Sequence, residues 1–170
     1  GDRMVLVESQ PKEAASLAAA LGRKRLVSVL ESDGYAALKA HLPPREGRGL
    51  VLVDPPYESD LEFDRVLAGL EVGHERWPTG TFCIWYPLTD RAGPLRFHRD
   101  LERSGIRKVL DVRLGVLPAD AQVGMAGAGL VIVNPPWLLD ERLKELLPQL
   151  HLLLSPEGLG GTSVEWLVPE

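Results

Sequence analysis

The most informative stretch of the sequence is an acid, two prolines and an aromatic residue that directly follow an apolar run. Val51–Val53 is followed by Asp54, Pro55, Pro56 and Tyr57. An amino group on an aromatic ring is a poor nucleophile, because its lone pair is delocalised. The Asp54 carboxylate can accept one of its N–H groups and the Pro55 carbonyl the other, which turns the lone pair toward an electrophile. The prolines stiffen this loop, and Tyr57 offers a flat face on which a base can stack.

A second stretch has the same form. Val131–Val133 is followed by Asn134, Pro135, Pro136 and Trp137. Both combinations are used by amino-methyltransferases that take their methyl group from S-adenosyl-L-methionine. The catalytic loop of that fold follows its fourth strand, a position that suits Asp54, whereas Asn134 comes several strands later. We therefore predict that Asn134–Trp137 is a structural turn.

Two further strand ends carry residues suited to a nucleoside cofactor. Glu8 ends one apolar run and can bridge ribose hydroxyls, while Asp33 and Gly34 follow the next run. Asp33 can accept from the adenine amino group of the cofactor, and Gly34 presents an unshielded backbone N–H. Alone, each is equally a turn or a helix cap. Together with Asp54 they end successive strands, and ligands of open α/β sheets bind at such ends.

The elements that must position these residues alternate along the chain. Unbroken apolar runs predict strands, and spacings of three and four predict helices. Strands are expected near residues 4–7, 26–30, 49–53, 81–86, 108–116, 130–133 and 163–168, and helices near 11–21, 35–41, 61–70, 94–104 and 138–154. In the run 108–116 apolar and polar residues alternate more than in the other runs, which predicts a strand with one face nearer to water. The pattern predicts a doubly wound α/β fold with a mostly parallel sheet covered on both faces.

Composition excludes several classes of protein. No apolar run reaches the length of about 18 residues that a membrane helix needs, which favours a cytoplasmic protein. The lone cysteine, Cys83, lies in an apolar run, and the histidines show no metal-ligand spacing, so we expect an inert thiol and no metal. The net charge of −5 is not that of an obvious polyanion binder, yet six basic residues gather between Arg91 and Lys108. They are either solvated or in contact with RNA phosphates.

The sequence resembles the bacterial 23S rRNA adenine-N6 methyltransferase J family over essentially its whole length. The resemblance rests on these segments: 49–58, 79–81 with 85–87, 105–108, 124–125 with 133–137, and 164–170. It implies a Rossmann-like, three-layer fold that methylates an adenine N6 in 23S rRNA with S-adenosyl-L-methionine and without metal. Carried over by position, Glu8, Asp33, Gly34 and Asp54 would belong to the cofactor site, and Asp54 would be the catalytic acceptor.

The chain departs from the family's pattern at its beginning. No Gly-rich loop follows the first strand, so we expect residues 1–170 to form one partial catalytic domain that lacks the first βα unit. Weak cofactor binding is expected of the isolated chain, and a monomer of the full-length form. Two alternatives stay open: an amino-methyltransferase acting on DNA adenine or a protein amide, and a non-catalytic RNA-binding or assembly module.

Overall fold

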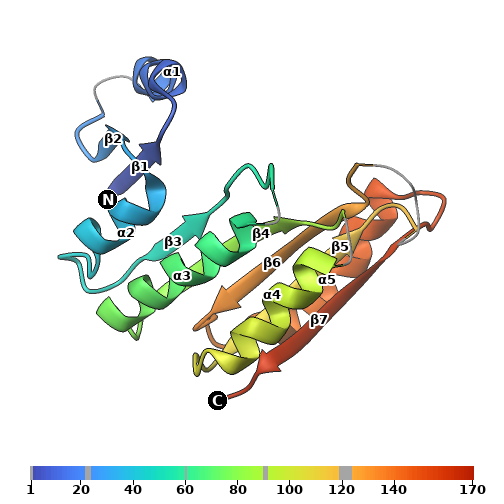
Figure 1. The fold of residues 1–170 in the computed structure, drawn as a ribbon. Coiled ribbons are helices and arrows are strands. Elements are labelled where there is room, and N and C mark those ends of the chain that lie inside the picture. Colours follow the sequence, from blue (N-terminus) through green and yellow to red (C-terminus); the bar gives the residue numbers. More distant parts are fainter. Residues whose placement is uncertain (1, 22–23, 60, 90–91, 119–123) are drawn as a thin grey trace. The chain divides into compact units, whose positions relative to one another are not determined.

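A computed structural model describes residues 2–21, 24–59, 61–89, 92–118 and 124–170, which form two compact units, Gly1–Leu42 and Pro43–Glu170. The described part contains seven strands and five helices, coloured along the chain in Figure 1. Helices and strands alternate as the sequence predicts, which confirms the α/β class. Differences at the ends are small, except that α3 runs on to Arg76 and β6 begins at Gly127.

The first unit is a parallel βαβα arrangement. It consists of β1 (Met4–Glu8), α1 (Pro11–Leu21), β2 (Val27–Glu31) and α2 (Gly34–His41). β1 and β2 pair in parallel, from Met4 opposite Val27 to Glu8 opposite Glu31. Their carboxyl ends therefore lie at the same edge of this two-stranded sheet.

The second unit is built around a five-stranded sheet with the order β3-β4-β6-β5-β7. Its elements are β3 (Leu50–Val53), α3 (Leu61–Arg76), β4 (Thr81–Pro87), α4 (Ala92–Arg103), β5 (Val109–Gly115), β6 (Gly127–Val133), α5 (Leu139–Leu154) and β7 (Gly161–Val168). Only β3 and β4 pair in parallel; the other three pairs are antiparallel. The expected mostly parallel sheet does not describe this unit, because an unbroken apolar run reflects burial on both faces and not strand direction.

Both faces of the five-stranded sheet are covered. On one face, Leu110, Val112 and Ile132 pack with Leu147 of α5. On the other face, the alternate residues Phe82, Ile84 and Tyr86 of β4 are fully buried. Aromatic side chains of α3 and α4 pack on this second face; Phe63 contacts Phe97, and Phe97 contacts Tyr86. Within the described residues, no helix is long and apolar enough to cross a membrane.

One burial prediction is wrong. β5 was expected to have a wetter face, but Val109, Leu110, Asp111 and Val112 are all buried. Asp111, the residue that gives the strand its polar alternation, is fully buried in a network of polar side chains. Cys83 is half-buried in β4, and burial raises the pKa of its thiol. The reactive thiolate form is therefore less populated.

Candidate active site

The loop Asp54–Tyr57 begins where β3 ends, near the carboxyl end of β4. Val53 pairs with Ile84 in the parallel register, so the loop continues alongside Trp85. The Asp54 side chain is exposed, and Pro55 is half-buried. A rigid, solvent-facing carboxylate at the carboxyl edge of the sheet is placed to meet a ligand from outside.

Tyr57 is held in an unusual backbone conformation. Its φ is 49°, a left-handed value that bulky residues rarely adopt. Its hydroxyl donates a hydrogen bond of 2.7 Å to the Trp85 backbone oxygen, and its ring centroid lies 4.7 Å from that of Phe63 in α3. These contacts outweigh the strain and fix the loop against β4 and α3.

The similar loop at Asn134 lies toward the other end of β4. β6 runs antiparallel to β4, with Val133 opposite Phe82, so the carboxyl end of β6 meets the amino end of β4. The Asn134 Nδ2 group donates to the backbone oxygens of Pro78 and Gly80, both at 2.8 Å. Since its amide holds together the segment before β4, Asn134 has a structural role, as predicted.

In the first unit, Glu8 and Asp33 lie at one edge of the parallel strand pair. The backbone N–H of Ser32 donates to the Glu8 backbone oxygen at 3.0 Å, which joins the two strand ends. Glu8 Oε1 accepts from the Gln10 backbone N–H at 2.7 Å, and Asp33 Oδ1 caps α2 by accepting from the Ala36 N–H at 2.8 Å. Gly34 starts α2, and no atom lies within 4 Å of where its Cβ would be. The structure thus brings Glu8, Asp33 and Gly34 together beside open space, in a different unit from Asp54–Tyr57.

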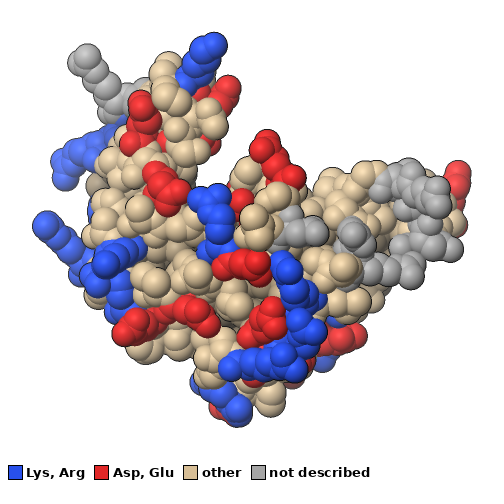
Figure 2. Space-filling model, in the orientation of Figure 1, with Lys and Arg blue, Asp and Glu red and all other residues tan. Residues whose placement is uncertain are grey.

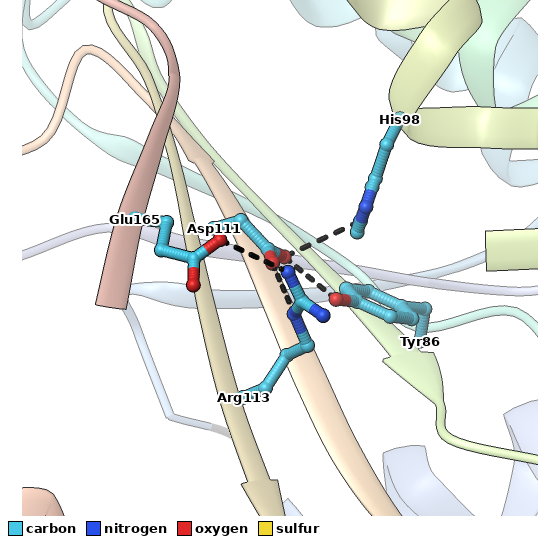
Figure 3. Close-up of polar contacts among 5 residues, drawn as sticks. All are labelled: Tyr86, His98, Asp111, Arg113 and Glu165. Carbon is cyan, nitrogen blue, oxygen red and sulfur yellow. Dashed lines mark hydrogen bonds and ion pairs between the residues drawn. The ribbon is translucent and has the colours of Figure 1, made fainter. Parts of the chain in front are cut away.

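Sequence reasoning missed a buried charge network in the second unit. Asp111 of β5 accepts a hydrogen bond of 2.6 Å from the Tyr86 hydroxyl and one of 2.5 Å from Arg113 Nε (Figure 3). His98 Nε2 of α4 lies 3.4 Å from Asp111 Oδ1, and Arg113 reaches Glu165 of β7 at 3.4 Å. The sequence signal was the single acid within an apolar strand, which we interpreted as a wet face.

The network shifts the titration of its members. Burial alone would raise the pKa of Asp111, but its contacts with His98, Tyr86 and Arg113 outweigh burial and hold that pKa below its usual value. Burial and the neighbouring Asp111 charge raise the pKa of Tyr86 far above its usual value. The carboxylate is therefore ionised and the phenol is neutral at physiological pH.

The loop after β3 has the composition and the strand-end position of the amino-methyltransferase class. A family model described as ribosomal RNA large subunit methyltransferase D, RlmJ, matches residues 1–168, and the chain belongs to this family. Membership implies a methyl donor.

Two curated relatives carry the name ribosomal RNA large subunit methyltransferase J. The protein from Haemophilus influenzae is 44% identical and the one from Escherichia coli K12 is 40% identical, each over 99% of this chain and 60% of the relative. The chain thus spans about 60% of the length of these relatives. A crystal structure of a Legionella pneumophila protein matches with a TM-score of 0.88 and 32% identity, covering 97% of this chain and 61% of that protein.

Proposed function

We propose that the complete protein that includes this chain methylates the N6 amino group of an adenine in 23S rRNA, with S-adenosyl-L-methionine as donor. The observation that carries the proposal is the exposed Asp54 in a stiffened loop at the carboxyl end of β3. It occurs in a chain of the RlmJ family whose relatives are named for methylation of large-subunit ribosomal RNA.

Each residue of the loop has its own role in activating the amino group. Asp54 accepts one N–H of the adenine amine and the Pro55 carbonyl accepts the other, which directs the nitrogen lone pair at the methyl group. Pro55 and Pro56 restrict the backbone, so little ordering remains to be done when the substrate arrives. Tyr57 supports the loop through its contacts with β4 and α3, and its ring forms the wall on which the base stacks.

The donor supplies an electrophilic methyl group when bound. The first unit suits such a nucleoside: Glu8 lies at a strand end where it can accept from ribose hydroxyls, and Asp33 is an exposed acceptor next to it. The open space beside Gly34 lets a ligand approach the start of α2 closely. We assign Glu8, Asp33 and Gly34 to the donor, with Asp54 at the methyl group.

The remaining features follow from the same proposal. The two units act as one catalytic domain with a Rossmann-like, three-layer fold, and the reaction needs no metal. Within the described residues, no group of three His, Cys, Asp or Glu side chains is placed to hold a metal ion. A 23S rRNA substrate puts the activity in the cytoplasm, and we expect the complete protein to act as a monomer.

The test is methyl transfer to 23S rRNA by the complete protein, with nuclease digestion and mass spectrometry of the product. We expect N6-methyladenosine, and a loss of about 10²–10⁴-fold in kcat for Asp54→Ala. Asp54→Asn retains an acceptor oxygen and should keep part of the activity. Glu58→Gln, an exposed carboxylate of the same loop, is the matched control and should behave as wild type. Transfer only to DNA or to a protein amide would overturn the substrate assignment.

A further inference from the structure

A cavity of about 460 Å³ opens at the carboxyl edge of the five-stranded sheet, on the face covered by α4. Its walls are largely apolar and include Leu88 after β4, Leu95 of α4 and Leu117 after β5. Both the volume, within the range of roughly 300–1,000 Å³, and the apolar walls are typical of small-ligand sites.

Two of the lining residues have a buried polar atom that forms no hydrogen bond with a residue that the structure describes. His98 Nε2 and Ser163 Oγ both belong to lining residues, are buried, and have no hydrogen-bond partner among the described residues. His98 as a whole is 8% exposed, and its Nε2 faces Asp111 Oδ1 at 3.4 Å, so Ser163 Oγ is the atom of the two that has no polar neighbour in the Asp111 network. Buried polar atoms are normally satisfied, so the Ser163 hydroxyl keeps a hydrogen-bonding capacity that a ligand in this cavity could use.

The cavity lies at the same edge of the sheet as the Asp54 loop. β4 and β5 both run antiparallel to β6, so they share the direction of β3, and their carboxyl ends face the same way. A continuous row of rings joins the two sites. Centroid distances are 4.7 Å from Tyr57 to Phe63, 5.5 Å from Phe63 to Phe97 and 6.5 Å from Phe97 to Tyr86, which lines the cavity.

The surface beside the cavity favours a polyanion. α4, which contributes Leu95 and His98 to the cavity, also carries the exposed Arg99 and Arg103. Figure 2 shows Lys and Arg side chains, with Asp and Glu side chains among them, over the region where Figure 1 draws this helix. Arg91, from the same basic stretch of sequence, lies outside the described residues. These charges suit phosphates that flank a group seated in the cavity.

We propose that this cavity binds a second base of the substrate RNA, one near the target adenine in space. The inference rests on the proposed function and extends it from the reacting base to substrate recognition. A flat base would lie between the apolar walls and turn its polar edge toward the Ser163 hydroxyl. The unpaired ring edge of a base supplies both donors and acceptors, and the flat ring suits the aromatic wall formed by Tyr86.

The experiment compares Leu95→Trp, which fills the cavity, with Leu153→Trp, which places the same ring on α5, on the opposite face of the sheet. Both leucines are exposed, at 63% and 79%, so neither change should disturb folding, and melting temperature checks this. In the complete protein, Leu95→Trp should raise KM for a 23S rRNA fragment at least about fivefold, as expected for loss of one stacked base. KM for S-adenosyl-L-methionine and kcat should stay as in wild type, and Leu153→Trp should match wild type throughout.

Ser163→Ala separates binding from structure. Removing an unpartnered hydroxyl should leave the melting temperature unchanged or higher, while RNA affinity falls about threefold or more. Unchanged KM for RNA in both cavity variants, or a rise in KM for the donor instead, overturns the inference and leaves the proposed function intact. If the wild type transfers no methyl group, the proposed function fails. Fluorescence anisotropy of the labelled RNA fragment then decides the inference, because equal affinities of wild type and Leu95→Trp would refute it.

Discussion

Replacing Asn134 and replacing Asp54 are expected to have opposite effects, although the two residues occupy the same position in similar loops. The Asn134 amide is used inside the protein, where it donates to the Pro78 and Gly80 backbone oxygens at 2.8 Å each. The Asp54 carboxylate is exposed, and it accepts no hydrogen bond from another residue that the structure describes. Removing Asn134 should therefore cost stability, whereas removing Asp54 should cost catalysis.

The cost at Asn134 follows from its contacts. A neutral hydrogen bond contributes about 1 kcal/mol net, so Asn134→Gly should lower the free energy of unfolding by about 2 kcal/mol. Asn134 has a φ of 50°, and a Cβ without the compensating amide adds roughly 1 kcal/mol in this region. Asn134→Ala should thus lose about 3 kcal/mol. Asp54→Ala should stay within about 0.5 kcal/mol of wild type.

Urea unfolding of the complete protein, followed by tryptophan fluorescence, measures these differences, and methyl transfer well below the unfolding midpoint measures activity. The Asn134 variants should unfold at lower urea concentration and keep wild-type kcat while folded. Asp54→Ala should unfold like wild type and lose about 10²–10⁴-fold in kcat. A stable but inactive Asn134→Gly, together with an active Asp54→Ala, would show that the roles of the two loops had been assigned the wrong way round.

Three further substitutions test the packing around the site. Tyr57→Phe removes the hydrogen bond that the Tyr57 hydroxyl donates to the backbone of β4 and should cost about 1 kcal/mol by urea unfolding, with base stacking retained and KM for RNA little changed. Gly129→Ala puts a Cβ 2.1 Å from the Tyr86 ring and should lower the free energy of unfolding by about 3 kcal/mol or more. Gly124→Ala is the control, because nothing lies within 4 Å of its added Cβ, and it should leave the melting temperature unchanged. Asp111→Asn should destabilise the protein at pH 7, by about 3 kcal/mol, because the part-buried Arg113 guanidinium loses the carboxylate to which its Nε donates. The pKa of Asp111 is lowered in the folded protein. The ionised carboxylate therefore adds to the free energy of unfolding above the usual aspartate pKa of about 4, and this stabilisation is lost as pH falls through the folded pKa. Plots of stability against pH for wild type and Asp111→Asn should thus converge in acid.

Each of these has an outcome that counts against it. A Tyr57→Phe variant without activity would make the hydroxyl part of the chemistry. Equal melting temperatures for Gly129→Ala and Gly124→Ala would mean that the Tyr86 ring moves without cost. Parallel pH curves for wild type and Asp111→Asn would mean that Asp111 is not ionised in the folded state.

Most of the fold was predictable because its signals are local. Apolar runs and helical spacing identify every strand and helix of the described residues to within a few positions, apart from the end of α3 and the start of β6. Strand direction was not predictable, since a strand buried on both faces has the same pattern whether its neighbours are parallel or antiparallel.

The place of the Asp54 loop at a strand end was also predictable, because its four residues are adjacent in the sequence, and its chemistry stays a prediction. The Asp111 network was not predictable, because its partners are assembled by register and helix packing. Tyr86 lies on another strand and His98 on α4, and no local pattern links either of them to Asp111. Alternation alone also cannot separate a polar side chain in water from one paired in the interior. The same holds for Ser163, because no local sequence pattern indicates that its hydroxyl is buried in a cavity wall.

Under the proposed function, strand direction decides which of the two similar loops can serve the reaction. β3 and β4 are parallel, so Asp54 continues to the edge where the open sheet receives ligands. β6 runs the other way, so the same succession of strand, amide, prolines and aromatic delivers Asn134 to the amino end of β4. There the backbone oxygens of Pro78 and Gly80 occupy its amide. Under the proposed function, a motif of this kind is therefore catalytic only when the strand that carries it has the right direction, and the reversed strand delivers the similar motif to a structural turn.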